Sequence, residues 1–294
     1  MIVCYVIWGN KLSLYAEAVF SLLTFLPDSH ISEICVVTDH PNYLCMVEGS
    51  VTIVPVDGQT FDGWGGNSNF LFRKKIKGIE KVVSLYPGRD VLYLDTDTFH
   101  GGDMAVIAQA LAGNKVCMGD SSGYIGKAKD RNNRELYAKI RDRTFCGYRV
   151  GEKSIRLNAG MVGLPAAHAS EILADAIGIC DELYKLTGYV GSEEVAFSFA
   201  LGKFAAVTDI GATIGHYWGN KTQWGGAIRD FLMEHALRCS SLAQMTQAAA
   251  AFDFKKMPTY THKPKRHKQL VRLAEKFWPL TRQRYFPEQP KQWL

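Results

Sequence analysis

The stretch VLYLDTD (residues 91–97) decides the fold that the sequence predicts. Four apolar residues run directly into Asp95 and Asp97, a pattern typical of a buried strand that ends in a polar loop. Two carboxylates one residue apart repel each other unless a cation lies beside them, and Mg²⁺ and Mn²⁺ prefer oxygen ligands. The pair therefore predicts a metal site at a strand end, and the alternative is a solvated acidic turn.

Other strand-like segments alternate with helix-like segments along the chain. Strands are expected at 2–8, 33–39 and 51–56, and amphipathic helices at 13–26 and 73–86. This alternation predicts an α/β fold with a mixed, mostly parallel sheet flanked by helices. Ligands of such sheets bind outside the carboxyl ends of the strands, where the two aspartates are expected. The more polar region 101–150 predicts a helical excursion on the surface.

The composition is that of an ordinary domain with a core of good size: 294 residues, 47% hydrophobic and 21% charged. The seven cysteines include no CxxC pair and several lie in apolar runs, so we expect reduced thiols and a cytoplasmic location. The apolar N-terminus is expected to form the first strand and not a signal peptide. No apolar run is long enough to cross a bilayer.

The charge is distributed unevenly. Residues 251–294 contain 11 Lys/Arg and 3 Asp/Glu, whereas residues 1–250 contain 23 and 26. We therefore expect a catalytic domain at 1–250 and a basic, aromatic-rich helical tail at 251–294. The segment HKQLVRLAEKFW (267–278) places apolar residues on one helical stripe among basic ones, which suits an anionic membrane surface. Peripheral association with the inner face of a membrane is expected; the alternative is a helix packed on the domain, and no motif supports nucleic-acid binding.

Two later segments carry candidate site residues between the aspartates and the tail. LNAG (157–160) places Asn158 on a turn of small residues, where its amide can bind sugar hydroxyls; the alternative is an ordinary turn. SEEVAF (192–197) opens a helix with Glu193 and Glu194. One of these glutamates is expected to serve the helix dipole, and the other, with Glu193 favoured, to face the crevice.

The segment HYWGNKTQW (216–224) is the most specific of these motifs. It combines the imidazole of His216, the flexible Gly219 and the cation of Lys221. Imidazole can complete a Mn²⁺ ligand shell, and glycine amides with a lysine suit a diphosphate. A lone histidine is more often structural, but this combination favours a binding site.

Taken in order, these motifs resemble the GT-A glycosyltransferases, most closely those of family 8. The resemblance covers roughly residues 1–225 and includes Arg73 in FLFRKKIKG (70–78). It implies a single GT-A, Rossmann-like domain that moves a hexose from a nucleotide-diphosphate sugar, first of all a UDP-sugar, to a glycan or lipid-linked acceptor. It further implies retention of configuration and a place in polysaccharide or lipopolysaccharide biosynthesis.

The resemblance also implies roles for individual residues. The ligands of Mn²⁺ or Mg²⁺ would be Asp95, Asp97 and His216. Contacts to the donor nucleotide sugar would come from Trp8, Asn10, Arg73, Asp95, Asn158, Gly219 and Lys221. Where family 8 has an Asp-Gln pair, this chain has Glu193 and Glu194, which suit a nucleophile or, on the other face, a general base for inversion.

Two other functions are compatible with Asp-x-Asp at a strand end. Aspartate-nucleophile phosphatases share it, but they place it near the N-terminus, with Thr or Val where this chain has Phe99. A non-catalytic nucleotide-sugar-binding module would keep the pocket without needing the paired glutamates.

Overall fold

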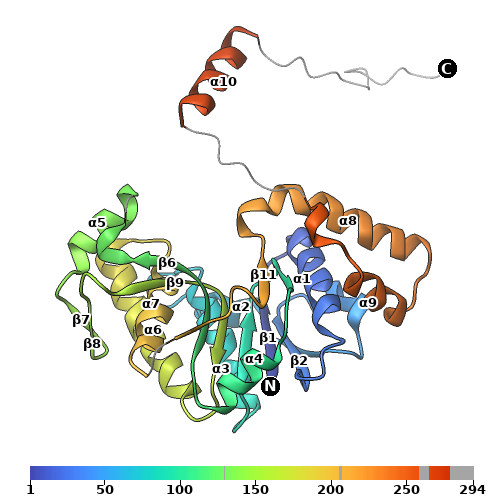
Figure 1. The fold of residues 1–294 in the computed structure, drawn as a ribbon, viewed down its shortest axis with the longest axis horizontal. Coiled ribbons are helices and arrows are strands. Elements are labelled where there is room, and N and C mark those ends of the chain that lie inside the picture. The colour runs from blue at the N-terminus through green and yellow to red at the C-terminus, as the bar shows by residue number, and fades with distance from the viewer. Residues whose placement is uncertain (129, 205–206, 258–264, 279–294) are drawn as a thin grey trace. The chain divides into compact units, whose positions relative to one another are not determined.

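The computed structural model describes residues 1–128, 130–204, 207–257 and 265–278 (Figure 1). Contacts divide the chain into two compact units, Met1–Met257 and Pro258–Leu294. The second contains helix α10 (Lys265–Phe277). The first runs past the expected boundary at residue 250, because the ring of Phe254 stacks on that of Phe99 at 4.0 Å. Within the described residues, no helix combines the length and apolarity needed to cross a bilayer.

A seven-stranded sheet forms the centre of the first unit, with the order β10-β6-β9-β4-β1-β2-β3. Its strands are β1 (Ile2–Ile7), β2 (Glu33–Thr38), β3 (Thr52–Pro55), β4 (Val91–Leu94), β6 (Cys117–Tyr124), β9 (Ile155–Leu164) and β10 (Thr208–Asp209). Strand β9 is antiparallel to both of its neighbours, and all other pairs are parallel. The predicted mixed, mostly parallel sheet is confirmed.

The strand order creates a switch point between β1 and β4. The chain proceeds outward from β1 through β2 and β3 and then returns to place β4 on the other side of β1. Loops that leave the carboxyl ends of two such strands diverge and open a crevice between them. Trp8 follows β1 and Asp95 follows β4, so both lie at the mouth of this crevice.

Helices cover both faces of the sheet (Figure 1). One face carries α3 (Arg73–Leu85), α6 (Ala169–Thr187) and α7 (Ser192–Gly202). The other carries α1 (Leu12–Phe25), α4 (Ala105–Ala112), α8 (Lys221–Leu237) and α9 (Leu242–Ala250). Because both faces are covered, all six residues of β1 are buried, as is typical of a central parallel strand.

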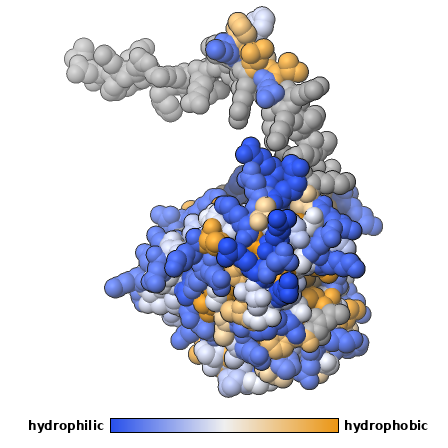
Figure 2. Space-filling view, turned by 90° about the vertical axis from the view of Figure 1, so that its left-hand side faces the viewer, coloured by the Kyte–Doolittle hydropathy of each residue, from blue (hydrophilic) through white to orange (hydrophobic). Residues whose placement is uncertain are grey.

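The expected excursion is shorter than region 101–150. Helix α4 packs on the sheet, and strand β6 is part of the sheet, so both belong to the core. The excursion consists of α5 (Arg131–Ile140) and a hairpin of β7 (Thr144–Phe145) and β8 (Tyr148–Arg149). The face that bears them is mainly hydrophilic, with hydrophobic residues interspersed (Figure 2).

Short elements complete the described chain. Strands β5 (Thr98–His100) and β11 (Ile214–His216) form a separate antiparallel pair. The remaining helical turns are η1 (Pro41–Val47), α2 (Gly58–Gly63), η2 (Ile125–Lys127), η3 (Trp218–Asn220) and η4 (Phe254–Lys256).

Gly78 has no side chain, and this allows α3 to pack directly on β1. A Cβ at this position would lie 2.4 Å from Cγ1 of Val6. Gly78→Ala should therefore lower the free energy of unfolding by about 1–3 kcal/mol, although alanine is the better helix former. Gly226→Ala in α8 is the matched control, because no atom lies within 4 Å of its added Cβ. Urea unfolding that shows the two variants equally stable would contradict this packing.

Candidate active site

A two-stranded ladder brings His216 beside the Asp95–Asp97 turn. In the pairing of β5 with β11, His216 lies opposite Thr98. The backbone NH of Tyr217 extends the ladder by donating to the carbonyl of Asp97 at 3.1 Å. The imidazole, which is far from the aspartates in sequence, is therefore held next to them by backbone hydrogen bonds.

Helix α1 and strand β9 fix this turn in place. The hydroxyls of Ser21 and Thr98 are hydrogen-bonded at 3.2 Å, and the backbone NH of His100 donates to Oγ1 of Thr24 at 3.1 Å. On the other side, the NH of Asp95 donates to the carbonyl of Gly160 at 2.7 Å. The turn is thus attached to both layers around it, as a site with fixed geometry requires.

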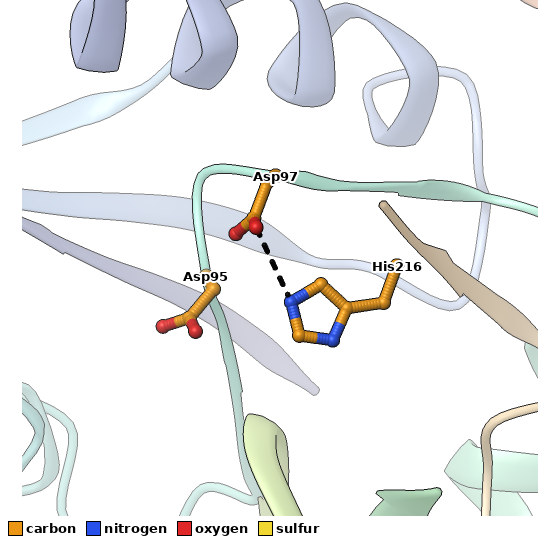
Figure 3. Close-up of side chains that lie close together, drawn as sticks. All are labelled: Asp95, Asp97 and His216. Atoms are coloured by element: carbon orange, nitrogen blue, oxygen red, sulfur yellow. Dashed lines mark ion pairs between the residues drawn. The ribbon is translucent and has the colours of Figure 1, made fainter. Parts of the chain in front are cut away.

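Asp95, Asp97 and His216 form a group suited to one divalent cation. Each offers a ligand atom within 4.8 Å of the other two, and the imidazole points toward the turn (Figure 3). Both ring nitrogens of His216 are buried without a hydrogen bond among the described residues, and Nε2 lies 3.5 Å from Oδ2 of Asp97. Buried polar atoms rarely stay unpaired, and oxygen or imidazole ligands bind such ions at about 2.1 Å. The residues therefore fit the metal that the sequence predicted.

Lys221 is a cation that contacts this group directly. Its Nζ, at the start of α8, lies 3.1 Å from Oδ2 of Asp97 and 3.3 Å from Oε2 of Glu17. Burial disfavours the charge of Asp97, but the imidazole of His216, 3.5 Å away, and the charge of Lys221 prevail and lower its pKa to about 2. Asp97 is therefore an anion at neutral pH.

Glu17 is a site residue that the sequence analysis missed. It is buried, and burial raises its pKa despite the nearby charge of Lys221. Its Oε2 also accepts a hydrogen bond from Thr96 at 3.3 Å. The available signal was that Glu17 is the one charged residue in the apolar helix over 12–25.

Lys75 is a second site residue that was missed. Its buried Nζ lies 3.0 Å from Oδ1 of Asp95 and 2.7 Å from Oε1 of Glu193. Burial disfavours its charge, but the two carboxylates prevail and raise its pKa. Burial raises the pKa of Glu193 to about 7, against the effect of Lys75. The sequence signal was a lysine that precedes Ile79 and Val82 by four and seven residues, on the apolar face of α3.

A cavity of about 240 Å³ opens beside the aspartates at the switch point. Its walls are formed by Val6, Ile7, Trp8, Leu14, Leu71, Phe72, Lys75, Tyr93, Asp95, Thr96, Asp97 and Lys221. Four of the residues expected at the site line it, namely Trp8, the two aspartates and Lys221. Lys75 lines the cavity, whereas Glu193 lies behind it.

The other seven expected residues lie outside this cavity lining. Asn10, Arg73 and Gly219 also lie outside the metal-binding group and its ion pairs. Asn10 is exposed in the loop after β1, and Gly219 is exposed in η3. Arg73 is directed elsewhere: its Nε lies 2.7 Å from Oδ1 of Asp181, and its Nη1 donates to the carbonyl of Trp64 at 2.8 Å. Its guanidinium therefore connects α3 to α6 and to the end of α2.

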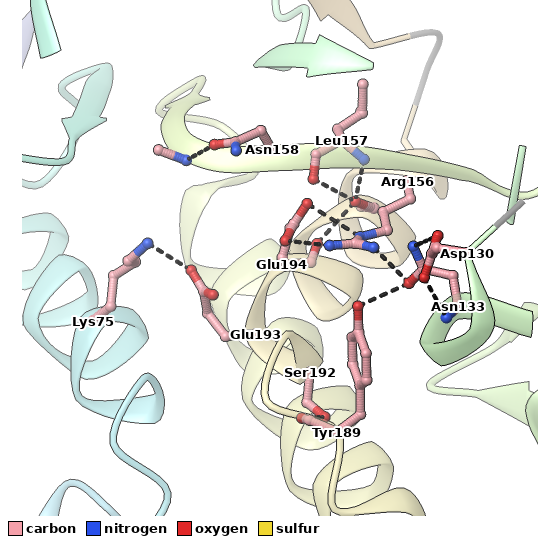
Figure 4. Close-up of polar contacts among 12 residues, drawn as sticks. Lys75, Asp130, Asn133, Arg156, Leu157, Asn158, Tyr189, Ser192, Glu193 and Glu194 are labelled. Atoms are coloured by element: carbon pink, nitrogen blue, oxygen red, sulfur yellow. Dashed lines mark hydrogen bonds and ion pairs between the residues drawn. The ribbon is translucent and has the colours of Figure 1, made fainter. Parts of the chain in front are cut away.

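The adjacent glutamates have different partners (Figure 4). Glu193 faces Lys75, whereas both carboxylate oxygens of Glu194 accept from Arg156, at 2.9 and 3.2 Å. Arg156 also donates to Oδ1 of Asn133 in α5, at 2.6 Å. Glu194 thus belongs to a network that attaches the excursion to α7.

Asn158 is half-buried within strand β9, so the turn that the sequence predicted at 157–160 is wrong. This strand belongs to the central sheet, where it pairs with β4 and β6. The Oδ1 of Asn158 accepts from the NH of Gly160 at 2.7 Å (Figure 4). Among the described residues no group accepts from its Nδ2, so this donor is available to a ligand.

Comparison with known proteins gives structural similarity alone. No protein-family profile matches the chain, and no curated protein sequence matches it. The galactosyltransferase LgtC, in complex with donor and acceptor sugar analogs, is 12% identical over 92% of this chain and 99% of that one, with a TM-score of 0.48. An active-site mutant of LgtC is 15% identical over 68% and 70%, with a TM-score of 0.44. Apo mouse xyloside xylosyltransferase 1 is 11% identical over 71% and 84%, with a TM-score of 0.45.

Gly160 provides the space that the imidazole of His216 occupies. A Cβ on Gly160 would lie 2.2 Å from Cε1 of that ring. Gly160→Ala should therefore displace His216 and weaken Mn²⁺ binding about tenfold or more, as measured by calorimetry. In a His216→Ala background the same change should alter the affinity by less than about twofold, because the clash is gone. An equal loss in both backgrounds would contradict this account.

Proposed function

We propose that the chain is a metal-dependent glycosyltransferase of the GT-A type, which moves a hexose from a nucleotide-diphosphate sugar to a glycan or lipid-linked acceptor. The observation that carries the proposal is the grouping of Asp95, Asp97 and His216. The two aspartates line the switch-point cavity together with Lys221. The proposed donor is a UDP-sugar, following the resemblance of the motifs to family 8.

The proposed roles follow from charge and position. A Mn²⁺ or Mg²⁺ ion held by Asp95, Asp97 and His216 would stabilise the leaving nucleoside diphosphate as a Lewis acid. Lys221, whose side chain is 41% exposed, would bind the same diphosphate together with the backbone of Gly219. The indole of Trp8 would stack on the nucleotide base, next to the exposed Asn10.

The donor sugar would meet a second set of side chains. Asn158 would donate from Nδ2 to a sugar hydroxyl, because its Oδ1 is already used by Gly160. Glu193 would support the reacting centre through Lys75, and Glu194 and Arg73 would hold the surrounding walls through their ion pairs. We propose retention of configuration, as the resemblance implies, and NMR of the first-formed product would identify the anomer.

Hydrolysis of nucleotide sugars tests this function. From a panel of UDP- and GDP-hexoses, one donor should be hydrolysed in the presence of Mn²⁺ and not in EDTA. Asp97→Asn should lower this rate about 100-fold or more, because the metal loses a charged ligand. Asp62→Asn is the control, since Asp62 is exposed and pairs with Lys74 away from the cavity.

Three results would count against the proposal. Turnover of no donor, with binding retained, would indicate a non-catalytic nucleotide-sugar-binding module. Metal-dependent release of phosphate from a phosphomonoester would indicate the phosphatase. Full activity of Asp97→Asn would contradict the role of the aspartates.

We further propose that α10 attaches the enzyme to the inner, anionic face of a membrane, where a lipid-linked acceptor would lie. Leu270, Leu273, Phe277 and Trp278 expose between 56% and 80% of their surface. The tail that surrounds them carries 11 Lys/Arg and 3 Asp/Glu. An exposed apolar stripe with basic flanks binds anionic lipid in two ways: its apolar side chains are buried among the lipids, and its basic side chains are attracted to the anionic headgroups. The rest of the tail, 258–264 and 279–294, lies outside the described residues.

Vesicle sedimentation tests this attachment. Phe277→Glu with Trp278→Glu should reduce binding to phosphatidylglycerol vesicles about tenfold or more, because two apolar side chains are lost and two negative charges gained. Met233→Glu, which changes a residue 60% exposed on α8, should leave binding unchanged. Undiminished binding of the double variant would exclude α10 as the anchor.

A further inference from the structure

The buried side chains of Lys75 and Glu193 form a row of charges with the half-buried Asp95, and this row reaches the metal-binding group from the side of α3 and α7. We propose that Glu193 sets the affinity of the site for divalent cations by drawing Lys75 away from Asp95. The proposal rests on the metal site of the proposed function, and it assigns Glu193 a positioning role that no motif suggests.

The contacts of Asp95 leave one oxygen for a cation. Its Oδ1 accepts from Lys75 at 3.0 Å and also from the hydroxyl of Tyr93. Among the described residues no polar group contacts its Oδ2. A cation at Oδ2 would therefore share the carboxylate with the ammonium of Lys75, and the two positive charges would repel each other across it.

Glu193 competes with Asp95 for Lys75. Its Oε1 lies 2.7 Å from Nζ, a shorter contact than the one to Asp95. Both Lys75 and Glu193 are at least nine-tenths buried, so water screens their interaction little. Lys75 also donates to the carbonyl of Ala159 at 3.3 Å. With the charge of Glu193 removed, Asp95 would be the one carboxylate of the described residues left to Lys75, and the ammonium would oppose the cation more strongly. With Lys75 removed, the site would bind the cation more tightly.

Glu194 provides a matched control one residue away. It lies on the same helix, but both of its oxygens are held by Arg156. Removal of its charge leaves the contacts of Lys75 unchanged. A comparison of Glu193→Gln with Glu194→Gln therefore separates the effect of Lys75 from a general loss of negative charge near the site.

Calorimetric titration of the full chain with Mn²⁺, without donor, tests the proposal. Glu193→Gln should weaken binding about fivefold or more, and Glu194→Gln should change it by less than about twofold. Equal weakening in both variants, or none in Glu193→Gln, would overturn the proposal. Failure of the wild type to bind Mn²⁺ would overturn the metal site of the proposed function as well. A failure of the proposal on Glu193 alone can therefore be distinguished from a failure of the metal site.

A double-mutant cycle tests whether Glu193 acts through Lys75. Lys75→Met should tighten Mn²⁺ binding, and Glu193→Gln should then have no further effect. If Glu193→Gln weakens binding equally in both backgrounds, its charge acts on the cation directly and the proposal is wrong. Lys75→Gln, which keeps a polar group beside both carboxylates, replaces Lys75→Met in the cycle if circular dichroism shows that Lys75→Met is unfolded.

Discussion

The antiparallel pairing of β5 with β11 is the interaction on which the site depends. It is a ladder of three residues on each side, outside the main sheet, yet it joins the Asp95–Asp97 turn to His216. The ladder alone would be marginal, because short isolated strand pairs are weak. The hydroxyl of Ser21 is hydrogen-bonded to that of Thr98, and Oγ1 of Thr24 accepts from the NH of His100, so α1 attaches β5 to the core. The same core also fixes the crevice between β1 and β4.

Charge balance explains how the surrounding side chains are arranged. A buried carboxylate needs a positively charged or hydrogen-bonding partner. The site has fewer lysines than carboxylates, so its negative charge is not fully neutralised. Two lysines, Lys75 and Lys221, face four carboxylates, those of Glu17, Asp95, Asp97 and Glu193. With all of these groups ionised, the difference is two negative charges, which one divalent cation would neutralise. Burial, and to a smaller degree the neighbouring carboxylates, raise the pKa values of Glu17 and Glu193.

The sequence predicted those site residues that lie at the end of a strand or within a recognisable motif. Asp95 and Asp97 end a strand, so the alternation of strands and helices placed them at the carboxyl edge of the sheet, and the motif HYWGNKTQW drew attention to His216. The direction in which an individual side chain of a helix points was harder to predict. Arg73 and Lys75 are two residues apart on α3 and point to different partners, and only tertiary packing decides which one reaches Asp95. Glu17 was hidden for the same reason, inside an apolar helix.

The central claim is that one divalent cation binds where the two distant segments meet. Anomalous diffraction from crystals soaked in Mn²⁺ measures this directly, because the metal is located without reference to any activity. The account predicts one strong anomalous peak in contact with Asp95, Asp97 and His216. A peak elsewhere, or none at these three side chains at saturating Mn²⁺, would contradict it.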